Sequence, residues 1–214
     1  MLGSNLNKIK LGIINLKLNN LFSIYQACHN IGYKTEIIDH KVKKYNHDIL
    51  ILPGVGSFNS AMSYLNKNGV RNRILDFVHK KNKILFSVCL GMQLLFEESA
   101  EFGSTKGLGL IKGKVKKLKK QKNIKIPHIG WADIRINSNK KNFINKRFNK
   151  RKYYFIHSYY CSPRYENEVC SFTSFGKTEF CSAVRKNNIL GTQFHPEKSG
   201  ALGLKMLSDL KKLL

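Results

Sequence analysis

The chain has 214 residues, of which 42% are hydrophobic, so it is long and apolar enough to fold around a sizeable core rather than stay disordered. No run of 18 apolar residues and no signal-peptide cleavage pattern occurs, so we expect neither a membrane span nor secretion. Five cysteines without a CxxC pair argue against a disulfide scaffold or a zinc site and predict a cytoplasmic protein. We expect no metal or other cofactor.

The formal net charge of +25 is the most unusual feature of the composition. Lysine-rich surfaces bind phosphate by releasing counterions, so a nucleic-acid-binding module has to be considered. The charge gathers in residues 112–125 and 140–152, which lie between apolar segments as solvated loops do. We therefore assign the charge mainly to solvated faces and keep an acidic protein partner or anionic ligand as the alternative. Sequence-specific nucleic-acid binding is not expected.

The first half of the chain alternates predicted strands with predicted helices. Apolar runs at 9–15, 34–39, 48–53 and 83–88 indicate strands, and apolar residues at helical spacing predict helices at 21–32, 57–66 and 70–81. Strands with nearly continuous apolar interiors are typical of a mostly parallel sheet that helices cover on both faces.

The second half predicts an antiparallel extension of that sheet. Segments 107–118, 153–160, 180–186 and 188–194 indicate strands joined by short turns, and 200–214 indicates a closing amphipathic helix. We find no linker or repeat and expect residues 1–214 to form a single α/β domain. Ligands of open α/β sheets bind beyond the carboxyl ends of the parallel strands. The loops "PGVGS", "VCLGMQ" and "FHPEKS" are therefore the candidate site.

Cys89 stands at the turn between a buried strand and a helix that we expect to begin at about Leu90. Ser87 and Gly91, two residues to either side, are small, as the sharp turn of a nucleophile elbow requires. The start of the helix would direct free N–H groups and a positive dipole end at the thiol, which favours the thiolate. A buried structural cysteine is the alternative, and the elbow pattern favours the nucleophile.

A nucleophilic thiol needs a base, and the base needs a group that orients it. His195 follows an apolar strand, and Pro196 restricts its backbone. Glu197, two residues on in an extended segment, would lie on the same side and accept a hydrogen bond from the imidazole. A capped surface histidine is the alternative for His195 alone, but the elbow cysteine favours the base. Packing or hydrogen-bonding roles are expected for the other histidines near strand ends, His128 and His157.

The loop "PGVGS" follows another buried strand. Gly54 and Gly56 free its backbone to turn N–H groups toward a developing negative charge. A tight turn is the simpler alternative. Beside an elbow cysteine, the loop predicts an oxyanion hole.

These segments, in this order, resemble the class I (triad) glutamine amidotransferases, and most closely the family of glutaminase subunits of imidazole glycerol phosphate synthase. The resemblance covers nearly the whole chain through "LPGVGSF", "CLGMQLLFEES", "GLGLIKGKV", "IPHIGW", "YYFIHSYY", "AVRKNNILGTQFHPEKSG" and "LGLKMLSDL". It implies that Cys89 attacks the side-chain amide of L-glutamine, giving a glutamyl thioester and ammonia. It further implies that His195 acts as base and then acid, oriented by Glu197.

The resemblance also implies roles for residues around this triad. The oxyanion hole would be formed by the backbone at Gly54, Val55 and Leu90. Glutamine would be held by Gly56, Gln93, Ser158 and Tyr159. The family passes its ammonia to a (β/α)8-barrel synthase subunit in histidine biosynthesis, which implies a heterodimer. The residues facing that partner would be Trp131, Tyr154 and Lys198.

Three positions depart from the family's pattern. Ser87 replaces the usual first glycine of the elbow, Asn19 replaces a glycine of the early loop, and Ala132 replaces the usual Asn after "IPHIGW". The glutaminase chemistry is still expected, but the acceptor reaction stays open. Paralogous glutaminase subunits that supply ammonia for amidation of a surface sugar are the alternative. A non-catalytic basic module that binds nucleic acid is a third hypothesis, which the intact triad disfavours.

Overall fold

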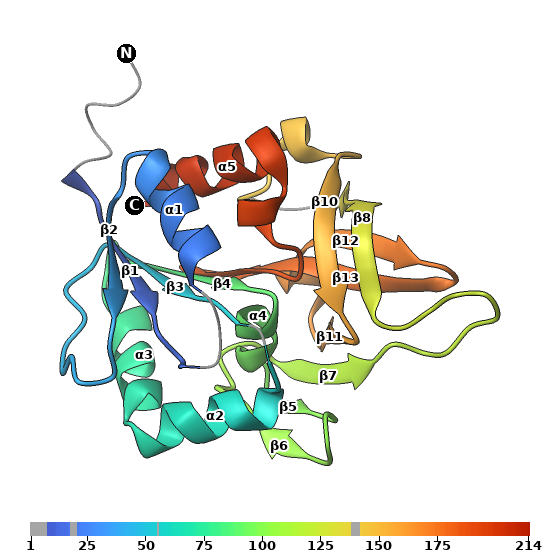
Figure 1. The fold of residues 1–214 in the computed structure, drawn as a ribbon, viewed down its shortest axis with the longest axis horizontal. Coiled ribbons are helices and arrows are strands. Elements are labelled where there is room, and N and C mark those ends of the chain that lie inside the picture. The colour runs from blue at the N-terminus through green and yellow to red at the C-terminus, as the bar shows by residue number, and fades with distance from the viewer. Residues whose placement is uncertain (1–7, 18–20, 55, 138–141) are drawn as a thin grey trace.

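The computed structural model describes residues 8–17, 21–54, 56–137 and 142–214 (Figure 1). Its strands are β1 (Lys10–Ile14), β2 (Lys34–Ile38), β3 (Ile49–Leu52), β4 (Ile84–Val88), β5 (Glu98–Ser99), β6 (Thr105–Lys106), β7 (Gly113–Lys117), β8 (His128–Asp133), β9 (Arg135–Ile136), β10 (Lys152–His157), β11 (Tyr159–Pro163), β12 (Val169–Phe175), β13 (Thr178–Lys186) and β14 (Ile189–Thr192). Its α-helices are α1 (Phe22–Asn30), α2 (Phe58–Lys67), α3 (Val70–Val78), α4 (Leu90–Leu94) and α5 (Gly200–Asp209). Its 3-10 helices are η2 (Lys146–Phe148), η3 (Glu166–Glu168), η4 (Pro196–Lys198) and η5 (Leu210–Leu213). Of the residues named above, Asn19 and Val55 lie outside the described residues.

Five strands form a parallel sheet in the order β2-β1-β3-β4-β14. Four of them come from the first half of the chain, and β14 comes from near its end. Helices α1 and α5 cover one face of this sheet and α2 and α3 the other (Figure 1). Strand β3 is buried throughout: Ile51 belongs to the core under α1 and α5, and Leu52 to the core over α2 and α3. This arrangement confirms the predicted α/β class, because a strand buried on both faces needs apolar residues at every position.

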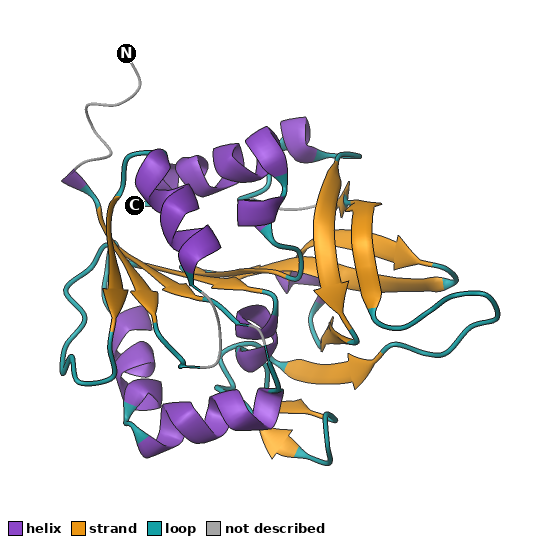
Figure 2. Cartoon of the chain, viewed as in Figure 1, coloured by secondary structure: helices purple, strands orange, loops and turns teal. Residues whose placement is uncertain are grey.

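The antiparallel extension continues from β14 through β13, β11 and β7, and few helices accompany it (Figure 2). Strand β14 is parallel to β4 and antiparallel to β13, so it joins the two halves. From the sequence we expected this strand only in the antiparallel extension, without its parallel pairing to β4. All four of its residues are buried, which suits a central strand that has a neighbour on each side.

Two further expectations about the second half were wrong. The single strand predicted at 153–160 is two strands, because the chain turns at Ser158: β10 pairs with β8 in a separate two-stranded sheet, and β11 pairs with β7 and β13 in the large one. The strand predicted at 107–118 forms only over Gly113–Lys117. Gly107 lies in the loop before it, where a Cβ atom would come within 2.2 Å of the Phe96 carbonyl oxygen.

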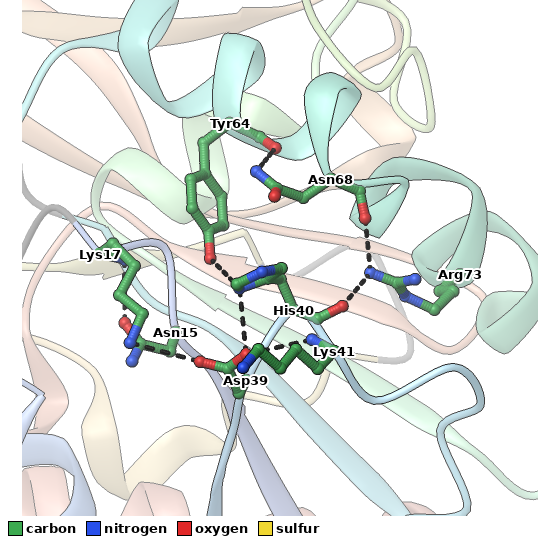
Figure 3. A network of polar contacts seen from close by, with 8 residues as sticks. All are labelled: Asn15, Lys17, Asp39, His40, Lys41, Tyr64, Asn68 and Arg73. Atoms are coloured by element: carbon green, nitrogen blue, oxygen red, sulfur yellow. Dashed lines mark hydrogen bonds and ion pairs between the residues drawn. The ribbon is translucent and has the colours of Figure 1, made fainter.

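A polar network around Asp39 connects the end of β2 with helices α2 and α3 (Figure 3). The Asp39 carboxylate contacts Lys17 at 3.3 Å and His40 at 3.0 Å. Tyr64 of α2 forms a hydrogen bond with the His40 ring, and Arg73 of α3 donates one to its carbonyl oxygen. These bonds fix the chain at the carboxyl edge of the parallel sheet, the edge at which the site forms.

A membrane-spanning helix is absent from the described residues, whose helices are too short or too polar to cross a bilayer. All five cysteines are buried and free.

Candidate active site

Cys89 occupies the sharp turn between β4 and α4. Its φ of 54° and ψ of −112° lie in a region that residues with a side chain rarely adopt. The Cys89 N–H donates a 2.7 Å hydrogen bond to the Thr192 carbonyl oxygen at the end of β14. The turn is thus held from the neighbouring strand, as a nucleophile elbow requires. Helix α4 begins at Leu90, as predicted, but it has only five residues.

Small residues let the start of α4 approach the end of β3. A Cβ atom on Gly91 would come within 1.9 Å of the Leu52 carbonyl oxygen, and one on Gly54 within 2.6 Å of the Gly91 nitrogen. Gly54 therefore lies against the first turn of α4, where N–H groups lack helical partners. This placement is what the predicted oxyanion hole needs, although Val55 is not described.

Ser87 is also confined, because it lies in register with Leu52 of β3 on one side and Gly191 of β14 on the other. Its side chain is fully buried, and its Oγ has no hydrogen-bond partner within the described parts of the chain. The elbow accommodates serine in place of glycine at the expense of a buried hydroxyl group without a partner.

His195 and Glu197 form the predicted pair. The imidazole Nδ1 donates to Glu197 Oε1 at 2.8 Å, and both side chains are more than 90% buried. The segment is not extended, however: Glu197 lies in η4, whose tight turn brings the carboxylate back to the ring. His195 is further fixed by its N–H, which donates to the Tyr154 carbonyl oxygen at 2.9 Å.

Both Cys89 and Glu197 affect the pKa of His195. Burial by itself lowers the pKa of His195, but the negative charge of the Cys89 thiolate and then of Glu197 outweighs it and raises the pKa to about 10. Because Nδ1 is bonded to Glu197, Nε2 is the nitrogen that remains for Cys89. Nε2 is buried and has no hydrogen-bond partner among the described residues. The thiol, the imidazole and the carboxylate thus interact in the order Cys89, His195, Glu197.

A cleft of about 500 Å³ opens at the thiol. It is lined by Gly56, Cys89, Leu90, Gln93, Glu101, Phe102, Lys117, Pro127, Ile156, His157, Ser158 and Tyr159. The structure thus brings the predicted nucleophile together with all four predicted glutamine-binding residues. Gly54, His195 and Glu197 are not among the lining residues.

Glu101 and Lys117 also line the cleft, and the sequence did not identify them. Glu101 Oε2 accepts a 2.6 Å hydrogen bond from the Phe58 N–H, which holds the carboxylate at the start of α2. Lys117 is the last residue of β7. Both reach the site because β7 pairs with β5 and β11, a pairing that no local sequence pattern reveals.

The two histidines near strand ends have hydrogen-bonding roles, as expected. His157 Nδ1 donates to the Tyr159 carbonyl oxygen at 2.9 Å, so its Nε2 can accept from His128 Nδ1 at 3.3 Å. Burial, followed by the nearby His128, lowers the pKa of His157 to about 3. His157 therefore lines the cleft as a neutral ring.

The residues expected to face a partner lie on or beside the β8–β10 sheet. Trp131 and Tyr154 are in register across its strands, with ring centroids 6.1 Å apart, and Trp131 is 55% exposed. Ile129 on the same sheet is 58% exposed. Lys198 lies on η4, which packs beside β10.

Comparisons with known proteins show the family of the chain. The family model "Glutamine amidotransferase class-I" matches residues 13–211. Imidazole glycerol phosphate synthase subunit HisH of Prochlorococcus marinus (strain NATL2A) is 41% identical over 92% of this chain and 93% of its own length. The HisH subunit of Bacillus subtilis (strain 168) is 36% identical over 95% and 96% of the two chains.

Solved structures share the fold at low identity. A chain in the structure of PurLQS from Thermotoga maritima superposes with a TM-score of 0.73 at 17% identity, covering 95% of this chain and 97% of its own. A glutamine amidotransferase from Thermotoga maritima gives a TM-score of 0.58 at 17% identity, covering 95% and 82%. Fold and site together define a class I glutamine amidotransferase. Within that class, the chain belongs to the family of HisH subunits of imidazole glycerol phosphate synthase.

Proposed function

We propose that this chain is the glutaminase subunit of an imidazole glycerol phosphate synthase. It hydrolyses L-glutamine to glutamate and ammonia and passes the ammonia to a (β/α)8-barrel synthase partner, as a heterodimer in the cytoplasm. The observation that carries the proposal is the row of Cys89, His195 and Glu197 beside a cleft of about 500 Å³.

In the first half of the reaction, the Cys89 thiolate attacks the carboxamide carbon of glutamine. The negative charge that develops on the oxygen is stabilised by backbone N–H groups at Leu90 and beside Gly54. The His195 imidazolium then gives its Nε2 proton to the leaving nitrogen. The C–N bond breaks, ammonia leaves, and the glutamyl group stays on the sulfur as a thioester.

In the second half, water cleaves the thioester. Neutral His195 takes a proton from the water at Nε2 while the water oxygen attacks the thioester carbon. The C–S bond then breaks, glutamate leaves, and the thiolate and imidazolium are restored. Glu197 keeps the Nδ1 proton in place through both halves, which holds Nε2 toward the reacting atoms.

The charges of the cleft suit the amino-acid end of glutamine. Glu101 offers a carboxylate to the α-ammonium group and Lys117 an ammonium to the α-carboxylate, both from the lining of the cleft. Gln93, Ser158 and Tyr159 supply polar contacts between these charges and the thiol. The substrate is thus recognised at one end and cleaved at the other.

The partner face is assigned to the β8–β10 sheet. Exposed apolar residues that gather on one surface mark sites of protein association, and Ile129 and Trp131 are among the most exposed large hydrophobic residues described. Lys198 adds a positive charge beside this face, which suits an acidic contact on the barrel.

The test is a glutaminase assay of the purified chain, alone and with the barrel subunit of the histidine pathway and its nucleotide substrate. We expect weak hydrolysis alone and clear stimulation by the loaded partner. Stimulation only by a barrel protein of surface-sugar biosynthesis would assign the chain to the alternative acceptor instead.

A further inference from the structure

Gln193 is a buried polar residue that the mechanism above does not use. It follows the last residue of β14, two residues before His195, and its side chain is fully buried. Its backbone N–H donates to the Ser182 carbonyl oxygen at 2.9 Å. A buried carboxamide needs hydrogen-bond partners for both its oxygen and its nitrogen, since an unpaired group is costly.

The partners of this carboxamide belong to the active site. Gln193 Nε2 donates to Cys89 Sγ at 3.7 Å. Gln193 Oε1 accepts from Gln93 Nε2 at 3.1 Å, and Gln93 Nε2 also donates to the Tyr159 carbonyl oxygen at 2.9 Å. A continuous row of hydrogen bonds therefore runs from the glutamine cleft to the nucleophile.

A backbone carbonyl fixes the direction of every bond in this row. The Tyr159 oxygen can only accept, so Gln93 must present its NH₂ group there. The second hydrogen of that NH₂ group points at Gln193, which must therefore present its oxygen to Gln93. The NH₂ group of Gln193 is left facing Cys89 Sγ, so the sulfur always meets a donor.

The sulfur lies between this donor and an acceptor. Cys89 Sγ is also 3.7 Å from the Ile156 carbonyl oxygen, to which a thiol can donate. When the thiol ionises, that bond is lost, whereas the bond from Gln193 becomes charge-assisted and stronger. The bond from Gln93 polarises the Gln193 amide in the same direction.

We infer that Gln193 is a positioning residue of the glutaminase reaction, which holds the Cys89 thiolate by a hydrogen bond and connects it to the glutamine site through Gln93. The inference rests on the proposed function. The bond stabilises the sulfur as attacking thiolate and again as leaving group, and it weakens while the sulfur is a neutral thioester. A glutamine substrate that contacts Gln93 therefore also affects the hydrogen bond from Gln193 to Cys89, because Gln93 orients the Gln193 amide.

The test is Gln193→Met, which keeps the length of the side chain and removes the donor. With the barrel partner present, we expect kcat to fall about 100-fold or more, in line with the loss of one donor to a developing charge, while KM changes less than about threefold. Alkylation of Cys89 by iodoacetamide, followed across pH, should show its midpoint raised by roughly one pH unit. A merely structural role would not move that midpoint.

Ser182→Ala is the matched control. Ser182 is fully buried beside Gln193, and its hydroxyl forms a 2.8 Å hydrogen bond with that of Ser171 rather than with the sulfur. We expect the substitution to lower stability and to leave the alkylation midpoint unchanged. An unchanged kcat and midpoint in Gln193→Met would overturn the inference.

If Gln193→Met does not fold, Gln93→Met is the variant that tests the inference. It removes the NH₂ group that donates to Gln193 Oε1 and so orients the Gln193 amide. We expect the midpoint to rise in the same direction, together with KM for glutamine; an unmoved midpoint contradicts the inference. Hydrolysis that persists in Cys89→Ala would instead refute the proposed function, so the two failures are distinct.

Discussion

The Glu197 carboxylate helps to determine how far into alkaline pH the active site keeps its charges. With the Cys89 thiolate, it raises the pKa of His195 to about 10, against the effect of burial. The imidazolium form of His195 therefore persists through neutral pH and is lost only as pH rises toward that value. The wild-type activity should accordingly have its alkaline limb far above the ordinary pKa of histidine.

Glu197→Gln tests this role of the carboxylate. Without its charge the pKa of His195 falls, so the alkaline limb of the glutaminase pH profile should move to lower pH. An amide also fails to fix the Nδ1 proton, and we expect kcat to drop about 100-fold or more. The measurement is kcat/KM against pH for both proteins, and an alkaline limb at the same pH in each would contradict the assignment.

Ser87→Ala tests the cost of the serine in the elbow. The buried Ser87 hydroxyl has no partner among the described residues, and such a group costs about 1–3 kcal/mol. Removing it should stabilise the protein by about 1 kcal/mol, which corresponds to a rise in Tm of about 2–4 °C for a chain of this size. Thermal unfolding measures the change; a lower Tm would show that the hydroxyl is satisfied.

At the scale of elements, the site depends on the close contact between the start of α4 and the end of β3. Gly91→Ala would place a Cβ atom 1.9 Å from the Leu52 carbonyl oxygen, so the elbow has to shift. A displacement of about 1 Å at the nucleophile can cost about 100-fold in rate. We expect kcat to fall by about that factor, and a fully active Gly91→Ala would exclude this packing as the reason for the glycine.

The sequence predicted the elements whose signal is local. The strands β3 and β4, the helix α2 and the turn at Cys89 carry apolar runs, helical spacing and small residues that determine their structure by themselves. The hydrogen bond from His195 to Glu197 was also predicted, although from an extended segment rather than the 3-10 helix η4.

Features that depend on pairing between distant strands could not be predicted. The segment 153–160 reads as one strand because its apolar pattern continues through Ser158, yet its halves join different sheets. Strand β14 has the pattern of a buried strand, but nothing local shows that β4 lies beside it. Glu101 and Lys117 reach the cleft for the same reason, through the pairing of β7 with its neighbours.

At the scale of the whole molecule, the β8–β10 sheet should bind the barrel partner. Trp131→Ala should raise the Kd of the complex at least about tenfold, which corresponds to about 1.4 kcal/mol. Ile129→Ala should raise it a few-fold. The glutaminase rate of the isolated chain should change little, because neither residue lines the cleft.

Ile37→Ala is the control for the partner face. Ile37 is 47% exposed, but it lies on β2, an edge strand of the large sheet. Strand β2 and the β8–β10 sheet lie on opposite sides of the molecule (Figure 1). Isothermal titration of each variant with the barrel partner compares the two isoleucines directly. Equal Kd values for Ile129→Ala and Ile37→Ala would place the interface elsewhere.

The net charge of +25 bears on what this surface attracts. A basic chain binds anions in a salt-dependent way whether or not it is an enzyme. Salt-dependent binding to RNA or DNA would therefore support the basic module only if the chain also failed to hydrolyse glutamine in the presence of the partner.

The most direct measurement labels the nucleophile itself. A glutamine analogue with an electrophilic carbon in place of the amide should modify the wild-type protein once, and peptide mass spectrometry should locate the adduct on Cys89. Cys89→Ala should take up no label and hydrolyse no glutamine with the partner present. An adduct on another cysteine, or hydrolysis that continues in Cys89→Ala, would contradict the Cys89–His195–Glu197 mechanism.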